Sequence, residues 1–486
     1  MTLSPEVVER LLHRHLEFHG LGNNEQSQSW TIKKSSLGGR GMFATRKIDQ
    51  GELIFVDAAL VVGPRRYSKY LPMCVGCYKS SCPLFPCDRE CGLPVCSKEC
   101  EDSPIHVECS ALGKWGTTCG SMWSSDILQA VLPIRALSLP QEQKDLVYAL
   151  ECHEGPRHGM EVDLLIKNVR NTISSEDEAF MRRVCGSCDT NSFETAVLVA
   201  NDSKEKFSMT SLRGLYPMGA MQNHSCVPNT RHHFDNSQKL FVSAARPIDQ
   251  GEELTMTYTE LLWDTTIRRQ LLVETKHFLC SCQRCSDPLE FGSLLGALKC
   301  ANQECSGILL PDDSLNMTTA WTCRECGLSM TNRQIKSIHS ALASIIQDIT
   351  KRSPRRILRF LLKELPVLVP KMNYVVIDLK FTIVSYFGRT DNISWKDLTD
   401  QELEIKREYC KDLIHTLDIL GCGDCKKKGL ILYELYCTNL EIHKRSMASR
   451  IPEKYKSILR KSIEILQNDL TVPNDYEANC QSLSSF

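Results

Sequence analysis

Cysteines supply the clearest chemistry in this sequence, because 25 of its 486 residues are cysteine and many of them stand in tight groups. The first group reads Cys74-x2-Cys77-x9-Cys87-x3-Cys91-x4-Cys96-x3-Cys100-x5-His106-x2-Cys109. A structural zinc ion takes four such donors, so this group can hold two ions and leaves Cys82 spare. The donors divide either into successive fours or into interleaved pairs, and spacing alone leaves both divisions open.

Two further cysteine groups lie towards the middle of the chain. One offers three donors, in the order Cys280-x-Cys282-x2-Cys285, and the other offers four, in the order Cys300-x4-Cys305-x17-Cys323-x2-Cys326. The three-donor group needs a fourth ligand, for which Cys226 is the candidate, whereas the four-donor group is typical of a zinc ribbon. A disulfide framework is the alternative, but it is typical of short secreted chains, and the N-terminal segment has no signal-peptide apolar block. We therefore predict metal sites in an intracellular protein.

Charge limits the class of protein to which these groups can belong. The chain has 58 Lys+Arg against 59 Asp+Glu, a formal net charge of −1. Within residues 74–109, three basic residues stand against six acidic ones. A DNA-binding zinc finger neutralises phosphates with Lys and Arg, so this composition argues against that class. No window of about 18 uncharged apolar residues indicates a membrane span either.

Three separated stretches contain residue types suited to ligand binding and catalysis. They are Gly38-Gly39-Arg40-Gly41-Met42-Phe43-Ala44, Asn223-His224-Ser225-Cys226-Val227-Pro228-Asn229 and Gly251-Glu252-Glu253-Leu254-Thr255-Met256-Thr257-Tyr258. Glycine has no Cβ, so the first stretch allows a ligand to approach the backbone closely. Taken singly, each stretch has an ordinary explanation: a hairpin turn, a glycosylation sequon in a secreted chain, or a core tyrosine in a strand.

In this order, and followed by the three-donor cysteine group, the three stretches resemble a SET domain. A MYND-type zinc finger inside a split SET domain, with a helical C-terminal third, resembles the SMYD family of protein lysine methyltransferases. The extra four-cysteine segment at 300–326 resembles arthropod members of that family. The resemblance implies transfer of a methyl group from S-adenosylmethionine to a lysine of a histone tail or another protein, with a role in transcriptional regulation.

The resemblance also implies how the metal ligands divide. Because the pairs of a MYND finger interleave, one zinc ion would take Cys74, Cys77, Cys96 and Cys100, and a second would take Cys87, Cys91, His106 and Cys109. A third would take Cys226, Cys280, Cys282 and Cys285 in a post-SET site, and a fourth Cys300, Cys305, Cys323 and Cys326. These ions would be structural, so chelation should unfold the segments that hold them.

For the reaction, the resemblance implies that Tyr258 orients the substrate amine and borders the cofactor. The other expected cofactor-binding residues are Gly38, Gly39, Arg40, Gly41, Asn191, Asn223, His224 and Phe278, the last of these stacking on the adenine. A lysine amine attacks only when neutral, although its ordinary pKa is about 10.4. A narrow, dry channel lowers that pKa by desolvation, and the sulfonium of the cofactor lowers it further by like-charge repulsion.

Two departures from the family pattern bear on activity. Lys276 stands where related enzymes have a second tyrosine, and Gly38 stands where many have a basic residue. Lys276 either promotes deprotonation of the substrate, prevents its binding or points to solvent. The alternative function is therefore a catalytically weak adaptor in transcriptional repression, whose MYND-type finger binds Pro-rich peptides. In either case we expect a monomer in the nucleus and cytoplasm, without direct contact to nucleic acid or membrane.

These residues must be positioned by an α+β fold. Apolar residues at helical spacing, such as Val8, Leu12 and Leu16, predict an N-terminal helix, and apolar runs at 52–56, 196–200, 239–244 and 255–259 predict strands. The expected organisation is an N-terminal helix (1–29), the first part of the SET domain (30–66), the MYND-type finger (67–110), a helical insert (111–184), the SET core (185–262), the post-SET segment (263–290), the zinc-ribbon-like segment (291–330) and an all-helical C-terminal domain (331–486). The resemblance implies that these last helices cover one side of the substrate cleft.

Overall fold

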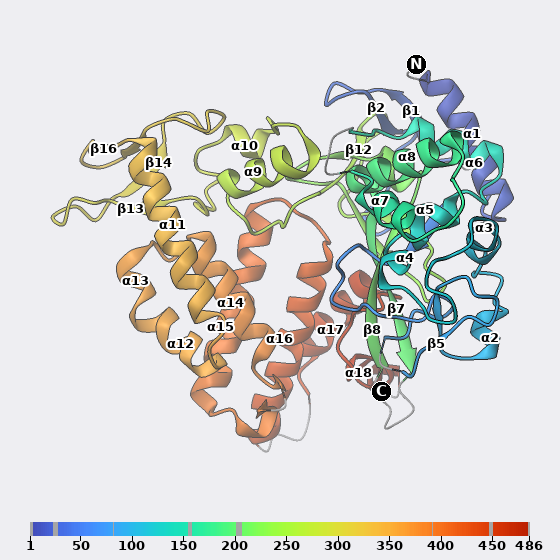
Figure 1. Cartoon of the computed structure of the whole chain (residues 1–486). Coiled ribbons are helices and arrows are strands. Elements are labelled where there is room, and N and C mark those ends of the chain that lie inside the picture. The colour runs from blue at the N-terminus through green and yellow to red at the C-terminus, as the bar shows by residue number, and fades with distance from the viewer. Residues whose placement is uncertain are drawn as a thin grey trace.

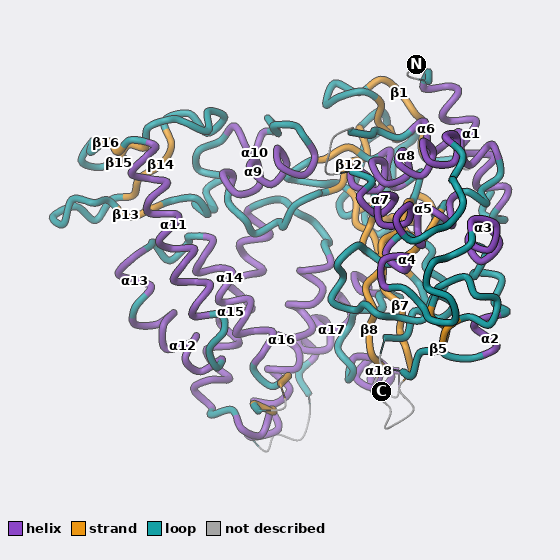
Figure 2. Tube along the Cα trace, viewed as in Figure 1, coloured by secondary structure: helices purple, strands orange, loops and turns teal. Residues whose placement is uncertain are grey.

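The computed structural model describes residues 3–22, 28–80, 82–153, 158–200, 207–390, 392–446 and 451–484. Figure 1 shows two halves, one built from the N-terminal strands and short helices and the other from the long helices of the C-terminal region. Figure 2 shows the same division by secondary structure, because most of the strands gather in the first half. This arrangement confirms the predicted α+β class with a helical C-terminal region.

Three small sheets form the scaffold of the first half. One has the strand order β1 (Trp30–Lys34), β2 (Arg40–Ala44), β12 (Glu253–Met256) and β9 (Asn223–His224). β9 lies parallel to β12, with Asn223 opposite Thr255 and His224 opposite Met256. This sheet therefore brings together the glycine-rich turn before β2, the Asn223–His224 pair and the chain that leads to Tyr258.

The other two sheets support this first one. Their strand orders are β10 (Thr230–Phe234), β11 (Leu240–Ala244), β3 (Leu53–Asp57) and β4 (Val61–Gly63), β8 (Phe207–Leu215), β7 (Phe193–Ala200). β3, β11 and part of β7 fall in runs that the sequence predicts, whereas β8 and β10 do not, and the predicted strand at 255–259 is wrong in its last three residues. β12 ends at Met256, because the backbone amide of Tyr258 donates to a ring nitrogen of His224 instead of to a neighbouring strand.

Helices pack around these sheets. They are α1 (Pro5–Phe18), α4 (Ser125–Gln129), α5 (Val131–Ala136), α6 (Gln141–Ala149), α7 (Met160–Lys167) and α8 (Ser175–Asn191). α1 begins with Pro5 in the first turn, where a missing N–H costs nothing, and it buries Val8, Leu12 and Leu16 against the sheets. The rest of the predicted N-terminal segment is not helical as far as it is described, and residues 23–27 lie outside the described residues.

The MYND-type segment folds as a small unit with little regular structure. Its elements are β5 (Phe85–Pro86), β6 (Pro94–Val95), α2 (Lys98–Glu101) and α3 (Glu108–Trp115). A buried ion pair anchors it to the helical insert, because Arg135 of α5 lies 2.7 Å from the carboxylate of Glu108. The same guanidinium donates to the hydroxyl of Tyr78 at 2.6 Å, so the finger is held against the rest of the first half.

The second half begins with two helices beside the three-donor cysteine group and a small four-stranded ribbon. These elements are α9 (Thr265–Lys276), α10 (Gln283–Ser286), β13 (Leu298–Lys299), β14 (Ile308–Pro311), β15 (Trp321–Cys323) and β16 (Ser329–Met330). The helices that follow are α11 (Asn332–Ile349), α12 (Pro354–Lys363), α13 (Leu365–Leu368), α14 (Tyr374–Tyr386), α15 (Asp400–Ile419), α16 (Lys426–Arg445), α17 (Glu453–Leu466) and α18 (Tyr476–Ser484).

The C-terminal region departs from an all-helical unit in one place. A short hairpin of β17 (Arg389–Thr390) and β18 (Ile393–Ser394) stands between α14 and α15. One apolar core runs from Leu261 and Leu295 through Trp321 of the ribbon into the helices, so the ribbon and the helical region are not independent bodies. Among the described residues, no helix has the length and apolar character needed to span a membrane.

Candidate active site and metal centres

Four groups of cysteine and histidine donors converge, and the donor atoms of each group lie within 4.8 Å of one another. Members of the third group illustrate the spacing, since the sulfur of Cys226 is 3.5 Å from that of Cys285 and 4.0 Å from that of Cys280. Four sulfurs bound to one zinc ion at about 2.3 Å stand about 3.8 Å apart, whereas a disulfide is about 2.05 Å long. The spacing therefore fits structural zinc and not disulfides.

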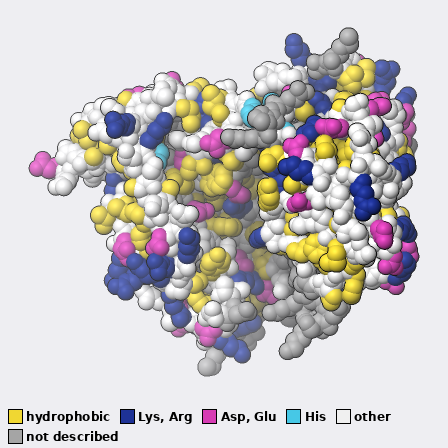
Figure 3. All heavy atoms as spheres, viewed as in Figure 1, with side chains coloured by type: hydrophobic (Ala, Val, Ile, Leu, Met, Phe, Trp, Pro, Cys, Tyr) yellow, Lys and Arg dark blue, Asp and Glu magenta, His cyan; other side chains and the backbone are white. Residues whose placement is uncertain are grey.

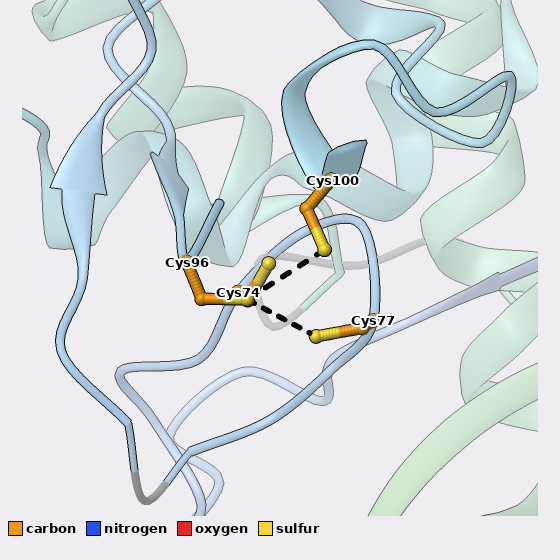
Figure 4. A group of neighbouring side chains, drawn as sticks. All are labelled: Cys74, Cys77, Cys96 and Cys100. Carbon is orange, nitrogen blue, oxygen red and sulfur yellow. Dashed lines mark hydrogen bonds between the residues drawn. The ribbon is translucent and has the colours of Figure 1, made fainter. Parts of the chain in front are cut away.

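The structure brings together the four donor sets that the family resemblance implies. They are Cys74, Cys77, Cys96 and Cys100; Cys87, Cys91, His106 and Cys109; Cys226, Cys280, Cys282 and Cys285; and Cys300, Cys305, Cys323 and Cys326. Figure 4 shows the first set, in which donors from two separate stretches of the finger face one another. The finger's donors therefore interleave and do not divide into successive fours, and Cys82 stays outside both groups.

The single histidine of the finger is held in a ligand orientation. Its Nε2 lies 3.5 Å from the sulfur of Cys91, and its Nδ1 lies 3.2 Å from the carbonyl oxygen of Glu101. A metal-binding histidine commonly donates its other ring N–H to such a carbonyl, which fixes the ring and its tautomer. His106 is thus positioned by α2 to point Nε2 at the metal position.

Two fully buried arginines surround the Cys226 group, although neither stands out in the amino-acid sequence. Arg268 donates to the sulfur of Cys226 at 3.2 Å and to the carboxylate of Glu290 at 2.8 Å. Arg284 reaches the same carboxylate at 2.9 Å and the carbonyl of Leu261 at 2.8 Å. Four thiolates around a divalent ion leave two negative charges, so these guanidinium groups offset charge that would otherwise be buried without a partner.

Replacing Arg268 with glutamine should lower the free energy of unfolding by about 3–5 kcal/mol, because it leaves a buried anionic group without its partner. The change is measured by denaturant unfolding of the metal-loaded protein. Arg352→Gln is a matched control. Arg352 lies just beyond the C-terminal end of α11, and its exposed side chain forms a surface ion pair with Asp348 in the last turn of that helix. Equal effects of the two substitutions would contradict the role of Arg268.

Tyr258 lies immediately beyond β12, next to the Asn223–His224 pair. Its hydroxyl donates to the carbonyl of Gln222 at 2.6 Å, and its backbone amide donates to Nδ1 of His224 at 2.9 Å. Because Nδ1 accepts this bond, Nε2 of His224 carries the proton and faces the sulfur of Cys226 at 3.2 Å. Burial raises the pKa of Tyr258 above its usual value, so its hydroxyl stays protonated at neutral pH. The ring of His224 therefore links the tyrosine to the third metal group through both of its nitrogens.

The glycine-rich turn is held by a residue to which the sequence assigned no role. The carboxylate of Glu253 accepts from the Ser35 hydroxyl at 2.8 Å and from the side-chain amide of Asn223 at 2.7 Å. A Cβ on Gly41 would lie 2.1 Å from this carboxylate, so any other residue there would displace Glu253 from these hydrogen bonds. Gly38 and Gly39 have φ values of +145° and +56° and face open space, which leaves their backbone accessible to a ligand.

Arg40 connects this turn to the other predicted cofactor residues. Its guanidinium donates to the carbonyls of Leu3, at 2.7 Å, and of Ala149, while its own carbonyl accepts from the Asn223 amide at 2.9 Å. Asn191, at the end of α8, donates to the carbonyl of Glu151 at 2.7 Å, in the same short segment after α6. The turn, Asn191 and Asn223 therefore border one site.

Phe278 completes that site from the other half of the chain. It is half-buried, and its ring centre lies 6.0 Å from that of His224. Arg40, Phe278 and Tyr258 are thus linked directly to the Asn223–His224 pair, and Gly38, Gly39 and Gly41 stand in the same turn as Arg40. Such an arrangement of exposed glycine backbone, two side-chain amides and a half-buried aromatic ring is suited to a nucleoside-containing ligand.

Lys276 points towards this site and not into solvent. It is the last residue of α9, its ammonium group donates to the carbonyl of Thr190 beside Asn191, and it lies 5.6 Å from the centre of the Tyr258 ring. Burial lowers the pKa of Lys276, and the nearby Arg65 lowers it further. The interpretation of a solvent-directed lysine is therefore wrong, since the burial of the stem and the Thr190 carbonyl hold the ammonium group inside.

A groove of about 700 Å³ opens on the other side of Tyr258, between the two halves of the molecule. Tyr258 and β10 line it from the first half, and Phe381 of α14 and Leu430 of α16 line it from the helical region. Figure 3 shows the molecule hollowed between these halves, with apolar side chains in the hollow. The C-terminal helices thus form one wall of the groove at the tyrosine.

The amino-acid sequence is similar to a family model and to several known proteins. A family model described as the SET domain matches residues 39–259. The SET domain-containing protein SmydA-8, isoform A, of Drosophila melanogaster is 33% identical over 443 residues, which cover 89% of this chain and 92% of that protein. The N-lysine methyltransferase SMYD2 of Gallus gallus is 26% identical over 51% of this chain and 58% of its own.

Among solved structures, the SET domain of LSMT bound to lysine and AdoHcy aligns over 99% of this chain and 93% of its own, with 11% identity. The TM-score of 0.27 is too low for the two folds to be compared. The similarity to the Drosophila protein is of another kind, because 33% of the residues are identical over nearly the full length of both chains. It agrees with the arthropod-type resemblance seen in the sequence. This chain belongs to the SMYD family of SET-domain proteins.

Proposed function

We infer that this protein is an S-adenosylmethionine-dependent protein-lysine N-methyltransferase. The observation that carries the inference is the position of Tyr258, which lies between a site suited to a nucleoside ligand and a groove suited to a protein segment. The N-lysine methyltransferase SMYD2 of Gallus gallus, a relative of this chain, supports the same reaction class.

The first site fits the cofactor by its hydrogen-bond groups. Asn191 and Asn223 use their NH2 groups within the protein, and no described residue donates to either side-chain oxygen. Those two oxygens are free to accept from an ammonium group such as that of the methionine part of S-adenosylmethionine. When bound, S-adenosylmethionine supplies an electrophilic methyl group on a sulfonium. The half-buried Phe278 offers a ring for stacking on the adenine.

On the groove side, the chain's own residues prepare the lysine. Met256, Leu261 and Trp263 make the groove beside Tyr258 largely apolar, which favours the neutral, nucleophilic form of an entering amine. The Tyr258 hydroxyl is fixed by the Gln222 carbonyl, and together they orient the amine at the reacting centre. For the metals, we propose four structural zinc ions, two in the finger, one at Cys226 and one in the ribbon.

Calorimetry of S-adenosylmethionine binding to the zinc-loaded full chain tests the proposal. We expect saturable binding of one cofactor per chain and transfer of a labelled methyl group from it to a protein substrate. Absence of heat at high cofactor concentration would refute the methyltransferase and favour a SET and MYND adaptor, the second candidate function. The observation that favours the adaptor is the Lys276 ammonium group near Tyr258.

Lys276→Met is expected to strengthen the binding of S-adenosylmethionine about tenfold. An ammonium group about 6 Å from another cation, at an effective dielectric of about 20, opposes it by roughly 3 kcal/mol, and part of this is relieved by local rearrangement. The product S-adenosylhomocysteine carries no sulfonium, so its affinity should change little. Calorimetry with both ligands measures the difference, and equal gains for both would show that Lys276 acts by shape and not by charge.

A further inference from the structure

We propose that the groove beside Tyr258 takes an extended protein segment whose target lysine is flanked by apolar, uncharged residues, and not a lysine- and arginine-rich histone tail. This inference rests on the proposed function and adds the class of substrate. It is carried by the balance of charge in the groove, where acidic and basic side chains are equal in number and most of the acids are paired within the protein.

The acidic residues of the groove have partners of their own. Glu260 lies 2.8 Å from the ammonium group of Lys427, and Asp469 lies 3.1 Å from that of Lys426. The remaining acid, Glu194, accepts from the Ser211 hydroxyl. Among the described lining residues, three acidic and three basic side chains are present, the third base being Arg231. The groove therefore offers a basic peptide no net attraction.

The remaining polar groups of the groove do not alter this balance. Arg231 donates to the carbonyls of Glu464 and Ile465, which occupies its guanidinium group. Burial lowers the pKa of His232 to about 4, and it also lowers the pKa of His233, so both rings are neutral at pH 7. A cation brought into such a site loses hydration, and two of the three carboxylates that it would meet are already paired with Lys426 and Lys427.

The apolar side chains of the groove, in contrast, form a continuous surface that is long enough to contact the target lysine and its neighbours in a bound segment. It includes Met256, Leu261, Trp263, Leu271, Phe381 and Leu430. A second cavity of about 570 Å³ shares Phe381, Leu430 and Thr471 with the groove and extends it towards Trp395. Its Arg389 is paired with Glu434 at 2.8 Å and with Asp475 at 2.6 Å, so this extension adds no free charge. An apolar flank of the lysine can thus be buried from Tyr258 towards Trp395.

The walls also require the segment to be unfolded. One wall is β10 and the chain after β12, and the other is formed by α14, the start of α16 and residues 469–471. Because both walls flank Tyr258, a target lysine reaches the tyrosine only when its neighbours lie extended along the groove. A lysine on the face of a folded helix has no such freedom.

Binding of labelled peptides to the full chain, followed by fluorescence anisotropy, tests the inference without relying on catalysis. One peptide carries a central lysine with Leu, Val, Ala, Ser and Thr around it, and a second of equal length has four of these neighbours replaced by Arg or Lys. We expect the apolar peptide to bind at least tenfold more tightly, with little change between 50 and 300 mM salt. Tighter, salt-sensitive binding of the basic peptide, or equal binding of both, would overturn the inference.

A substitution within the groove sharpens this test. Lys427→Met leaves the Glu260 carboxylate without its partner, so binding of the basic peptide should improve at least fivefold and that of the apolar peptide should change little. Lys428→Met is the matched control, because Lys428 pairs with Asp418 at 2.7 Å and does not line the groove. No gain for the basic peptide in Lys427→Met would also contradict the inference.

The two proposals fail in different ways. The expected order of peptide binding without any methyl transfer from S-adenosylmethionine would refute the enzyme and leave the groove's preference intact. Methyl transfer to the basic peptide in preference to the apolar one would refute only the substrate class.

Discussion

Tyr258→Phe is expected to lower the rate of methyl transfer by about 10²- to 10³-fold while the protein stays folded and still binds S-adenosylmethionine. The substitution removes only the hydroxyl that donates to the Gln222 carbonyl at 2.6 Å. A misplacement of about 1 Å at a reacting centre can reduce a rate about 10²-fold, and in the proposed reaction the lost hydroxyl is the group that fixes the amine. Leaving the buried Gln222 carbonyl unpaired costs about 1–3 kcal/mol of stability, which is a minor effect beside the loss of rate.

The rate is measured as label transferred from S-adenosylmethionine to a substrate peptide under saturating cofactor. Tyr148→Phe is the control for the chemical change itself, because Tyr148 is 52% exposed and stands on α6 away from the groove. The affinity for the cofactor is measured on both variants. A Tyr258→Phe protein that transfers methyl groups at the original rate would show that the hydroxyl has no part in the reaction.

Cys285→Ser is expected to have the largest effect on stability. A structural zinc ion contributes on the order of 10 kcal/mol to folding, which is comparable with the whole net stability of a domain. In this protein the loss would reach the active site directly, because Cys226 of the same group contacts His224, and His224 accepts from the backbone of Tyr258. Methyl transfer should therefore fall below detection together with the loss of one zinc ion.

Zinc content by mass spectrometry and thermal unfolding by circular dichroism measure this result. Cys82→Ser is the matched control, because Cys82 belongs to none of the four donor groups of the described chain. In a chelator titration, the ribbon group should lose its ion first, since Cys326 is exposed whereas Cys226 and Cys285 are buried. Unchanged unfolding temperature and full activity in Cys285→Ser would contradict a structural metal at this position.

The sequence was sufficient for the metal groups because their ligands come mostly in close pairs. Two cysteines separated by two to four residues can face one ion from a single turn, so the spacing alone indicates a site. The deficit of one donor at 280–285 already made Cys226 a candidate, but interleaving the finger's pairs required the family resemblance, because sequence spacing does not say which distant segments meet. The structure then brings these donors within 4.8 Å of one another.

The residues that support the site could not be found in this way. Glu253 and Arg268 look like ordinary charged residues of a strand and a helix, and their importance arises only because the fold surrounds them with Ser35, Asn223 and Cys226. The end of β12 at Met256 depends on the same long-range contacts, since a ring nitrogen of His224 takes the amide that would continue the strand. Lys276 is similar, because the direction of its flexible stem depends on its burial, on the Thr190 carbonyl of α8 and on the nearby ring of Tyr258.

The bond from Arg40 to the carbonyl of Leu3 has a practical meaning for anyone who produces this protein. It joins Leu3 to the middle of the glycine-rich turn. An affinity tag fused ahead of α1 can therefore displace Leu3 and, through Arg40, disturb that turn. A tag placed after α18 avoids this contact. Weak cofactor binding by an N-terminally tagged preparation should therefore be checked again after the tag has been cleaved.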